Sequence, residues 1–249
     1  EHFQLYLTVM PAQGLTFQVG PKSTAMPVKQ VSQWGADYVS FSKDGKTLNW
    51  SIGPDYKSIQ VESFLFDDEA KTTAVNLSQS IDAAKPAGVI ALVGGKVITM
   101  DANRSVLEAG VVLIQENRIQ QVGTRSEVSI PADAKVLDVT GKTVMPGMID
   151  AHAHGPYARD QIIPQQNWSL LAHLALGVTT VHNPSSRSRQ VFAAAEYQKS
   201  GRILGPRIFS TGEIVYGAKS TGFAPVDSLD DALAHVKRLK SQGAVSIKN

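Results

Sequence analysis

The segment Asp150-Ala151-His152-Ala153-His154 contains the two side chains best suited to chemistry. Side chains of an extended strand alternate between its faces, so His152 and His154 point the same way. Two imidazoles that converge on one point suit a divalent metal, for example Zn²⁺ at about 2.0 to 2.1 Å per nitrogen. Two exposed loop histidines are the alternative. The preceding Pro146-Gly147 turn and the strands and helices that follow favour the metal site.

Lys248 is a further candidate for this site because it lies near the end of an expected strand. Alternation places Val245 and Ile247 toward the helices, and Ser246 and Lys248 toward the opposite, interior face. A lysine in that interior needs a partner or must lose its charge, since burial of an unpaired ammonium is very costly. A solvated lysine at a strand end is the alternative.

Three more side chains are candidate substrate ligands. Tyr157 and Arg159 lie in the loop after the histidine strand, where they suit a substrate carboxylate, although a lone loop arginine is usually solvated. His182 follows the next strand, where substrate contact and a hydrogen-bonded structural role are equally compatible. Asp150 points away from the two histidines, which favours a supporting role.

A regular series of strands and helices positions these residues. Strands are expected at 148–152, 178–181, 207–210 and 244–248, with helices that end at Gly177, near Ser200 and at Lys240. The second helix is expected to begin at Ser185 or Ser186, and the third at a capping box of Ser228 and Asp231. The expected apolar faces are Trp168, Leu171, Ala172 and Ala175 in the first helix, Val191, Ala194 and Ala195 in the second, and Leu229, Leu233, Val236 and Leu239 in the third.

Four such repeats predict parallel strands, which corresponds to half of an eight-stranded β/α barrel. A doubly wound open sheet is the competing fold. It would require a Gly-rich phosphate turn after its first strand, and here that strand ends in His-Ala-His instead.

The preceding residues have a β pattern throughout. In the first 80 residues, short strands are expected at 3–9, 15–19, 28–31, 38–41, 48–52 and 59–66, and Asp44-Gly45 predicts a hairpin turn. From Gly88 to Val144, strands are expected at 89–93, 96–100, 110–115, 118–122 and 135–139, separated by turns such as Gly94-Gly95. The boundary between these two β regions is expected at 86–88.

Residues 88–249 resemble the amidohydrolase superfamily. The stretch from Gly141 to His154, GKTVMPGMIDAHAH, is similar to the hallmark of that family, and 177–181, GVTTV, is similar to its second barrel strand. Within the superfamily, the chain is most similar to the imidazolonepropionase-like and prolidase-like branch. The hairpin at 41–50 resembles a blade of a TolB-like β-propeller, for which an ordinary hairpin is the alternative.

Pattern and resemblance together predict a mixed fold. An all-β N-terminal part, made of a propeller-blade remnant and a small β-sandwich, precedes the first half of an α/β (β/α)8 TIM barrel. The corresponding domains are 1–86 for the propeller-like strands, 87–146 for the β-sandwich and 147–249 for the incomplete barrel.

The resemblance implies a metal-dependent hydrolase that cleaves an amide, cyclic amide or dipeptide C–N bond with a metal-activated water. It implies one or two divalent ions, most simply Zn²⁺, held by His152 and His154 and bridged by Lys248 as a carbamate. The family's later His ligands and catalytic Asp have no counterpart here, so we expect this chain alone to be inactive. Missing sequence or a second polypeptide is expected to complete the barrel. A non-catalytic binding module and a degenerate barrel with a structural metal are the alternatives.

Composition excludes several other classes of protein. Hydrophobic residues at 43% and charged residues at 18% are typical of a globular chain rather than a disordered one. A net charge of +2 without a Lys/Arg block disfavours nucleic acid and anionic membrane as partners. The chain has no Cys, so disulfides and thiolate metal ligands are excluded.

The expected partners are a small amide or peptide substrate and the segment that completes the barrel, and a homo-oligomer is compatible with the sequence. The chain begins at Glu1 without Met or a signal peptide, so we expect a removed signal or a longer precursor. A chain without Cys fits the periplasm as well as the cytosol. We favour a periplasmic or secreted location, with the cytoplasm as the alternative.

Overall fold

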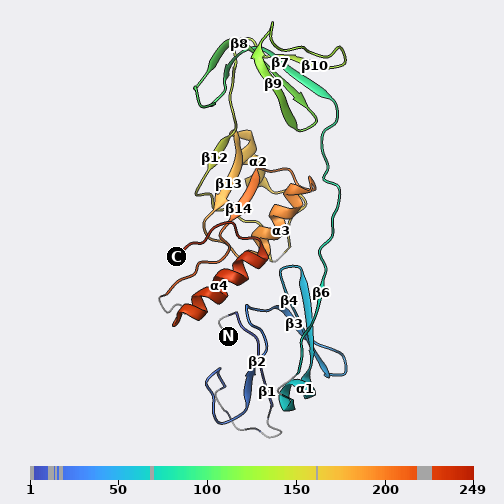
Figure 1. Cartoon of the computed structure of the whole chain (residues 1–249), viewed down its shortest axis with the longest axis vertical. Coiled ribbons are helices and arrows are strands. Elements are labelled where there is room, and N and C mark those ends of the chain that lie inside the picture. Colours follow the sequence, from blue (N-terminus) through green and yellow to red (C-terminus); the bar gives the residue numbers. More distant parts are fainter. Residues whose placement is uncertain are drawn as a thin grey trace.

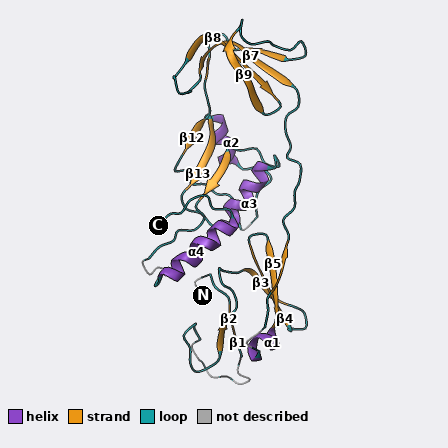
Figure 2. Ribbon diagram, in the orientation of Figure 1, coloured by secondary structure: helices purple, strands orange, loops and turns teal. Residues whose placement is uncertain are grey.

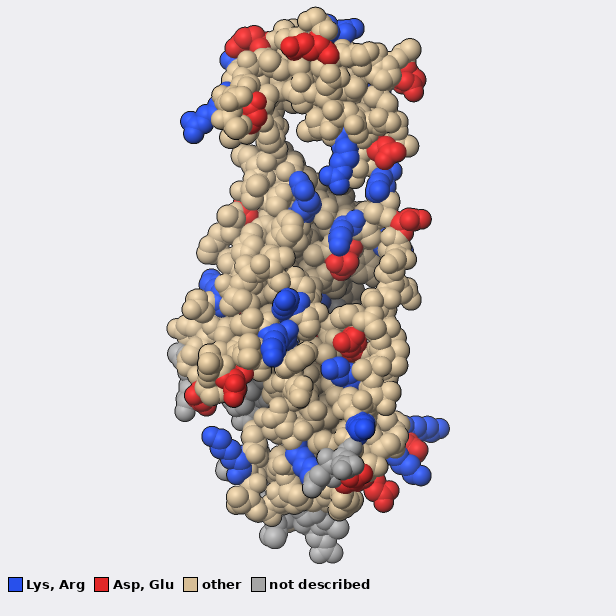
Figure 3. All heavy atoms as spheres, viewed as in Figure 1, with Lys and Arg blue, Asp and Glu red and all other residues tan. Residues whose placement is uncertain are grey.

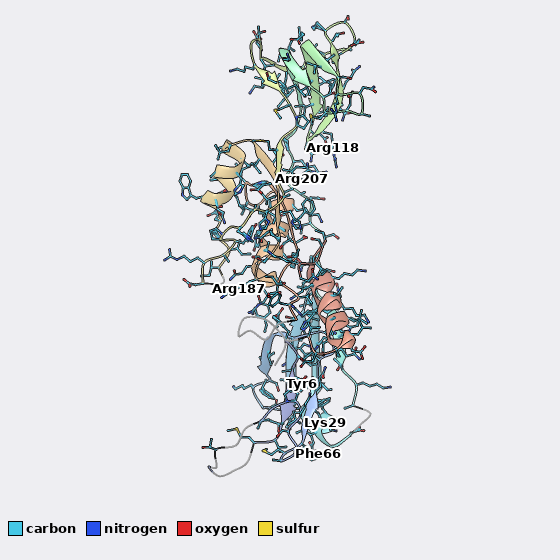
Figure 4. All side chains as sticks on the ribbon, turned by 90° about the vertical axis from the view of Figure 1, so that its left-hand side faces the viewer. Tyr6, Lys29, Phe66, Arg118, Arg187 and Arg207 are labelled. Atoms are coloured by element: carbon cyan, nitrogen blue, oxygen red, sulfur yellow. The ribbon has the colours of Figure 1, made fainter. Side chains whose placement is uncertain are left out.

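The computed structural model describes residues 3–10, 14, 16, 19–67, 70–160, 162–217 and 226–249. These residues form three parts that follow one another along the long axis of the molecule (Figure 1). The side view in Figure 4 shows the same order, with Arg118 in the upper sheet, Arg207 in the middle part, and Tyr6, Lys29 and Phe66 in the lower part. The lower part contains strands expected before residue 80, and the middle part contains β/α repeats. The upper part, where a small β-sandwich was expected, is a single five-stranded sheet.

The lower part contains two antiparallel sheets, β1-β2 and β3-β4-β5-β6. Its elements are β1 (Tyr6–Thr8), β2 (Val28–Gln30), β3 (Asp37–Phe41), β4 (Thr47–Ile52), β5 (Asp55–Gln60), α1 (Val61–Phe66) and β6 (Thr73–Asn76). The Asp44-Gly45 turn joins β3 to β4, and Gly45 has the positive φ of 72° that the turn requires. The expected strand at 15–19 includes residues outside the described part of the chain.

One element of the lower part was predicted wrongly. Residues 59–66 were expected to form a strand, but β5 ends at Gln60 and α1 begins at Val61. Val61, Phe64 and Leu65 have the spacing of one helix face, and they pack against the cluster around Trp50. This helical spacing explains why the segment turns instead of continuing β5.

The upper part is a five-stranded sheet of order β10-β7-β8-β9, with β11 also paired to β7. Its strands are β7 (Val89–Ile98), β8 (Val106–Gln115), β9 (Arg118–Thr124), β10 (Lys135–Asp138) and β11 (Thr143–Val144). The expected turn at Gly94-Gly95 is wrong, because β7 runs through both glycines. Gly94 has a φ of 87° and the register shifts on both sides of Gly95, so the pair bends one long strand.

The middle part contains the parallel sheet β12-β13-β14 and three helices (Figure 2). Its elements are β12 (Met148–Asp150), α2 (Trp168–Ala175), β13 (Val178–Asn183), α3 (Ser188–Lys199), β14 (Arg207–Ser210) and α4 (Leu229–Gln242). Val181 and Ile208 share a buried cluster with Leu170 of α2 and Val191 of α3. The opposite face of the sheet is more open, as the 41% exposure of Phe209 indicates.

The three helices differ in how well their faces were predicted. Val191 and Ala194 of α3 are buried as expected, but α3 begins after Arg187 and not after Ser185 or Ser186. In α2 the expected stripe is wrong, since Trp168 is 86% exposed and Leu170 is the buried residue. In α4 only Leu239 of the expected stripe is buried, whereas Leu229 is 84% exposed.

The lower part docks on α4 of the middle part. The Arg238 guanidinium lies 3.9 Å from the centroid of the Phe3 ring, and Lys237 lies 5.4 Å from that of Trp34. Gly35 lies so close to the Arg238 side chain that a Cβ at this position would collide with it. The lower part and α4 are therefore closely packed.

An extended segment at 77–88 connects the lower part to the upper part and runs beside the middle part (Figure 1). The Ala84 amide donates to the Ser200 carbonyl at the end of α3, at 2.9 Å. Gly201, with a φ of 76°, allows this approach, because a Cβ there would collide with Ala84. The expected boundary at 86–88 lies at the end of this connection.

On the face drawn in Figure 3, Lys and Arg are interspersed with Asp and Glu along the whole length, so neither charge forms a continuous surface there. Within the part of the chain that the structure describes, no helix has the length and apolar character needed to cross a membrane.

Candidate metal site at the ends of the parallel strands

His152 and His154 follow the carboxyl end of β12. The strand ends at Asp150, two residues earlier than expected, because the Asp150 carboxylate accepts a hydrogen bond from the His152 amide at 3.0 Å and turns the backbone. The chain nevertheless stays beside β13, since the Ala153 amide donates to the His182 carbonyl at 3.0 Å. The two histidines are thereby held at the carboxyl edge of a parallel sheet, where β/α barrels place their active sites.

The two imidazole rings lie beside each other on the surface. Their centroids are 5.1 Å apart and the ring planes meet at 78°. Both side chains are exposed, whereas Ala153 between them is 5% exposed and packs in the core. The alternation expected of a strand therefore persists beyond the end of β12.

Two adjacent imidazoles are suitable donors for a metal ion, but they are too few to form a complete site. Tetrahedral Zn²⁺ takes four ligands, and neutral imidazole nitrogens are among its usual donors. Within the described ranges, no group of three or more His, Cys, Asp or Glu side chains is placed to hold a metal ion. His152 and His154 fit a divalent metal chemically, and further ligands must complete its coordination.

The segment that carries Lys248 does not form the expected fourth strand. After α4, residues 244–249 have no strand assignment, and Val245 makes one backbone hydrogen bond to Ser210 of β14, at 3.3 Å. One such bond does not constitute a ladder. The Lys248 carbonyl accepts from the Val215 amide at 2.9 Å, which holds the half-buried lysine near the loop after β14.

His182, near the end of β13, contacts both the segment that follows β12 and the segment that carries Lys248. Its Nδ1 lies 3.3 Å from the Ala151 carbonyl oxygen, and its Nε2 lies 2.7 Å from Ser246 Oγ. Val181 and Asn183 on either side point into the core, so His182 faces the open side of the sheet. The structural role that the sequence left open for His182 thus has specific partners.

Tyr157 and Arg159 lie in very different surroundings. Tyr157 is 4% exposed within the core, and its hydroxyl accepts from Asn183 Nδ2 at 3.3 Å. Burial raises the pKa of the Tyr157 hydroxyl above its usual value, and the nearby Asp150 carboxylate also raises it. The Arg159 side chain is 96% exposed, with Asp160 Oδ2 at 3.9 Å from its Nε. Substrate contact by either residue stays a prediction.

Sequence reasoning missed Glu213, a residue of the loop after β14 that contacts both α3 and α4. Its carboxylate accepts hydrogen bonds from the amide and the hydroxyl of Ser188, at the start of α3. The same carboxylate forms an ion pair at 3.1 Å with the buried Arg238 of α4. A single acidic residue in an expected loop gave no signal of this role.

Comparisons with known proteins place these features in context. No protein-family model matches the chain. The chain is 51% identical over 65 residues to N-substituted formamide deformylase of Arthrobacter pascens, covering 25% of this chain and 12% of that protein. It is 41% identical over 107 residues to imidazolonepropionase of Geobacillus sp. (strain WCH70), covering 40% of this chain and 25% of that protein.

The fold is also similar to a solved structure. A prolidase-like protein from Bifidobacterium longum superposes with a TM-score of 0.52 at 26% identity, covering 65% of this chain and 40% of that chain. The chain thus spans well under two thirds of each of these relatives. The relatives are amidohydrolase-superfamily proteins, which confirms the predicted resemblance at that level.

Proposed function

We propose that this chain carries the first part of a metal-dependent amidohydrolase, in which His152 and His154 are two ligands of a divalent metal. The observation that carries the proposal is the adjacent pair of exposed imidazoles just beyond the end of β12, whose ring centroids are 5.1 Å apart. Zn²⁺ is among the metals that imidazole ligands suit, and the chain has no thiolate that would compete for it. The expected reaction is hydrolysis of an amide, cyclic amide or dipeptide C–N bond.

The chain's own residues would hold and orient the reacting groups. A bound divalent metal supplies a water of lowered pKa and polarises a carbonyl oxygen. Asp150 holds the backbone amide of His152, and His182 contacts the carbonyl of Ala151, so this turn is fixed on both sides. The Arg159 side chain is 96% exposed, so its guanidinium can meet a substrate carboxylate in addition to Asp160.

We further propose that additional β/α units complete a barrel over the open face of the β12-β13-β14 sheet. Support comes from the outer edge of β12, which pairs with no further strand among the described residues, and from two apolar side chains of that strand, Met148 and Ile149, which are 50% and 69% exposed. An exposed strand edge with apolar side chains favours aggregation unless another segment pairs with it. Missing sequence or a second polypeptide would supply this segment, together with further ligands and a catalytic acid.

The lower part would then be the remnant of a TolB-like propeller blade. Its β3-β4-β5-β6 sheet is an antiparallel meander of four strands, which is the arrangement of a single blade. A periplasmic or secreted location and a small amide or peptide substrate complete the proposal.

Hydrolysis tests the proposal directly. The chain, supplied with its completing segment, would be assayed with Zn²⁺ against an N-acyl amino acid, a cyclic amide and an Xaa-Pro dipeptide. We expect turnover of at least one substrate class, abolished by a chelator and by His152→Ala, but retained in His173→Ala on α2. Metal binding without hydrolysis would favour the degenerate barrel, and neither property would favour the binding module.

Lys248→Ala tests whether Lys248 bridges two metals as a carbamate. A carbamate adds a negative charge between two cations, so its loss should remove the second metal and reduce turnover by at least about tenfold. Added short carboxylic acids should restore part of both by occupying the bridge. Unchanged metal content and rate in Lys248→Ala would instead favour a site with one metal.

A further inference from the structure

The peptide bond between Ala151 and His152 is held by side chains on both of its polar atoms. The His152 amide donates to Asp150 Oδ1 at 3.0 Å, and the Ala151 carbonyl faces His182 Nδ1 at 3.3 Å. A peptide plane fixed in this way sets the position of the next Cα and restricts the directions open to its side chain. That next side chain is the imidazole of His152.

The contacts of His182 define which of its nitrogens carries the proton. The Ala151 carbonyl can only accept a hydrogen bond, so His182 Nδ1 must carry the proton for this contact to be favourable. In a neutral imidazole, Nε2 is then an acceptor, and the Ser246 hydroxyl at 2.7 Å must donate to it. Ser246 therefore donates a hydrogen bond to His182, and His182 donates one to Ala151.

Ser246 is in turn held by its own segment. The neighbouring Val245 amide donates to the Ser210 carbonyl of β14, and the Lys248 carbonyl accepts from Val215. The hydrogen bond from Ser246 to His182 consequently joins the Lys248 segment to the backbone that carries His152.

We propose that Ser246 and His182 are positioning residues, which fix the His182 tautomer and thereby orient the His152 imidazole relative to the Lys248 segment. The role of metal ligand for His152 rests on the proposed function, whereas the tautomer of His182 does not. Partners that orient metal ligands from outside typically contribute about 10-fold to 100-fold in metal affinity.

The first measurement is the tautomer, by NMR of the full chain labelled with ¹⁵N at histidine. We expect His182 to be protonated at Nδ1 in the wild-type chain and in Ser246→Thr, which keeps the hydroxyl. In Ser246→Ala we expect a mixture of tautomers, because the remaining contact with Ala151, at 3.3 Å, is longer than the lost contact with Ser246, at 2.7 Å, and holds the proton less strongly. A wild-type His182 protonated at Nε2, or a tautomer unchanged in Ser246→Ala, would overturn the proposal.

The second measurement is the Zn²⁺ affinity of the same variants, each supplied with the completing segment, by competition with a chelating dye. Ser246→Ala and His182→Ala should weaken Zn²⁺ binding about 10-fold or more, and Ser246→Thr should retain it. Ser241→Ala is the matched control, because its hydroxyl donates to the Arg238 carbonyl within α4. Equal affinity in Ser246→Ala and Ser241→Ala would contradict the positioning role. Failure of the wild-type chain to bind Zn²⁺ when the completing segment is present would refute the proposed function. The tautomer measurement would still test the contact between Ser246 and His182.

Discussion

At the scale of single residues, the side chains around the strand ends divide between the surface and the core. His152 and His154 lie on the surface, whereas Tyr157, only a few residues later, packs in the core with its hydroxyl on Asn183. Alternation within one short segment was enough to predict the adjacent histidines. It could not predict the contact between His182 and Ser246, because those residues are 64 positions apart and only the fold brings them together.

Tyr157→Phe tests whether this tyrosine is structural. Removal of its hydroxyl leaves Asn183 Nδ2 without this acceptor and should cost about 0.5 to 1.5 kcal/mol of unfolding free energy at pH 7. Because burial raises the pKa of Tyr157 above 10.0, its contribution to stability is present below pH 10 and is lost as the pH rises through the folded-state pKa. Urea unfolding between pH 7 and pH 11 measures both effects. Unchanged stability combined with weaker substrate binding would instead assign Tyr157 to the substrate.

At the scale of elements, sequence signals located helix ends better than helix faces. The expected cap at Ser228 is present in α4, and the helix ends at Gln242, two residues after the expected Lys240, where Gly243 has a φ of 115°. The apolar stripe of α4 was wrong because periodicity identifies an amphipathic helix but not the partner that covers it. The structure buries His235, Arg238 and Leu239. Similarly, Gly94-Gly95 was expected to form a turn, whereas in the structure this pair bends the continuous strand β7.

Ser228→Ala should destabilise the start of α4. Ser228 Oγ accepts from the Asp231 amide at 3.1 Å, and its hydroxyl lies 2.8 Å from Asp231 Oδ2. Loss of such a cap typically costs about 1 kcal/mol. The hydrogen bond from Ser228 also lowers the pKa of Asp231, so this contribution is present above pH 4 and lost as the pH falls through the folded-state pKa.

Hydrogen exchange of the α4 amides and NMR titration of Asp231 would measure these two effects. Ser241→Ala, near the other end of α4, serves as the comparison. Equal protection of the first turn in both variants would argue against the cap.

At the scale of the whole molecule, the lower part is joined to the middle part by polar contacts that the sequence could not predict. Gln242 Nε2 donates to Asp37 Oδ2 at 2.9 Å, although these residues are 205 positions apart in the sequence. Arg189 Nε lies 3.6 Å from Asp37 Oδ1. Arg238, which pairs with Glu213, is also covered by the Phe3 ring. The same helices that support the parallel sheet therefore bind the lower part.

Asp37→Asn should change how stability depends on pH. Burial raises the pKa of Asp37 above 3.8, and the Glu213 carboxylate adds to this, although Arg189, Arg238 and Gln242 lower it. A raised folded-state pKa means that this contribution is present below pH 3.8 and lost as the pH rises through the folded value. The stability of the wild-type chain relative to Asp37→Asn should therefore increase as the pH falls from 7 toward 4. A difference that stays constant over this range would show that Asp37 is not held at a raised pKa.

The central claim, that His152 and His154 hold a metal, is tested most directly by metal content. The wild-type chain, His152→Ala, His154→Ala and the control His173→Ala, each supplied with the segment that completes the barrel, would be dialysed against equal free Zn²⁺ and analysed for bound zinc. His173 is a suitable control because its ring contacts the Ser169 carbonyl within α2, at 2.7 Å. We predict bound zinc in the wild-type chain and in His173→Ala, and a reduction of about tenfold or more in both site variants. Equal zinc in all four proteins would contradict the account.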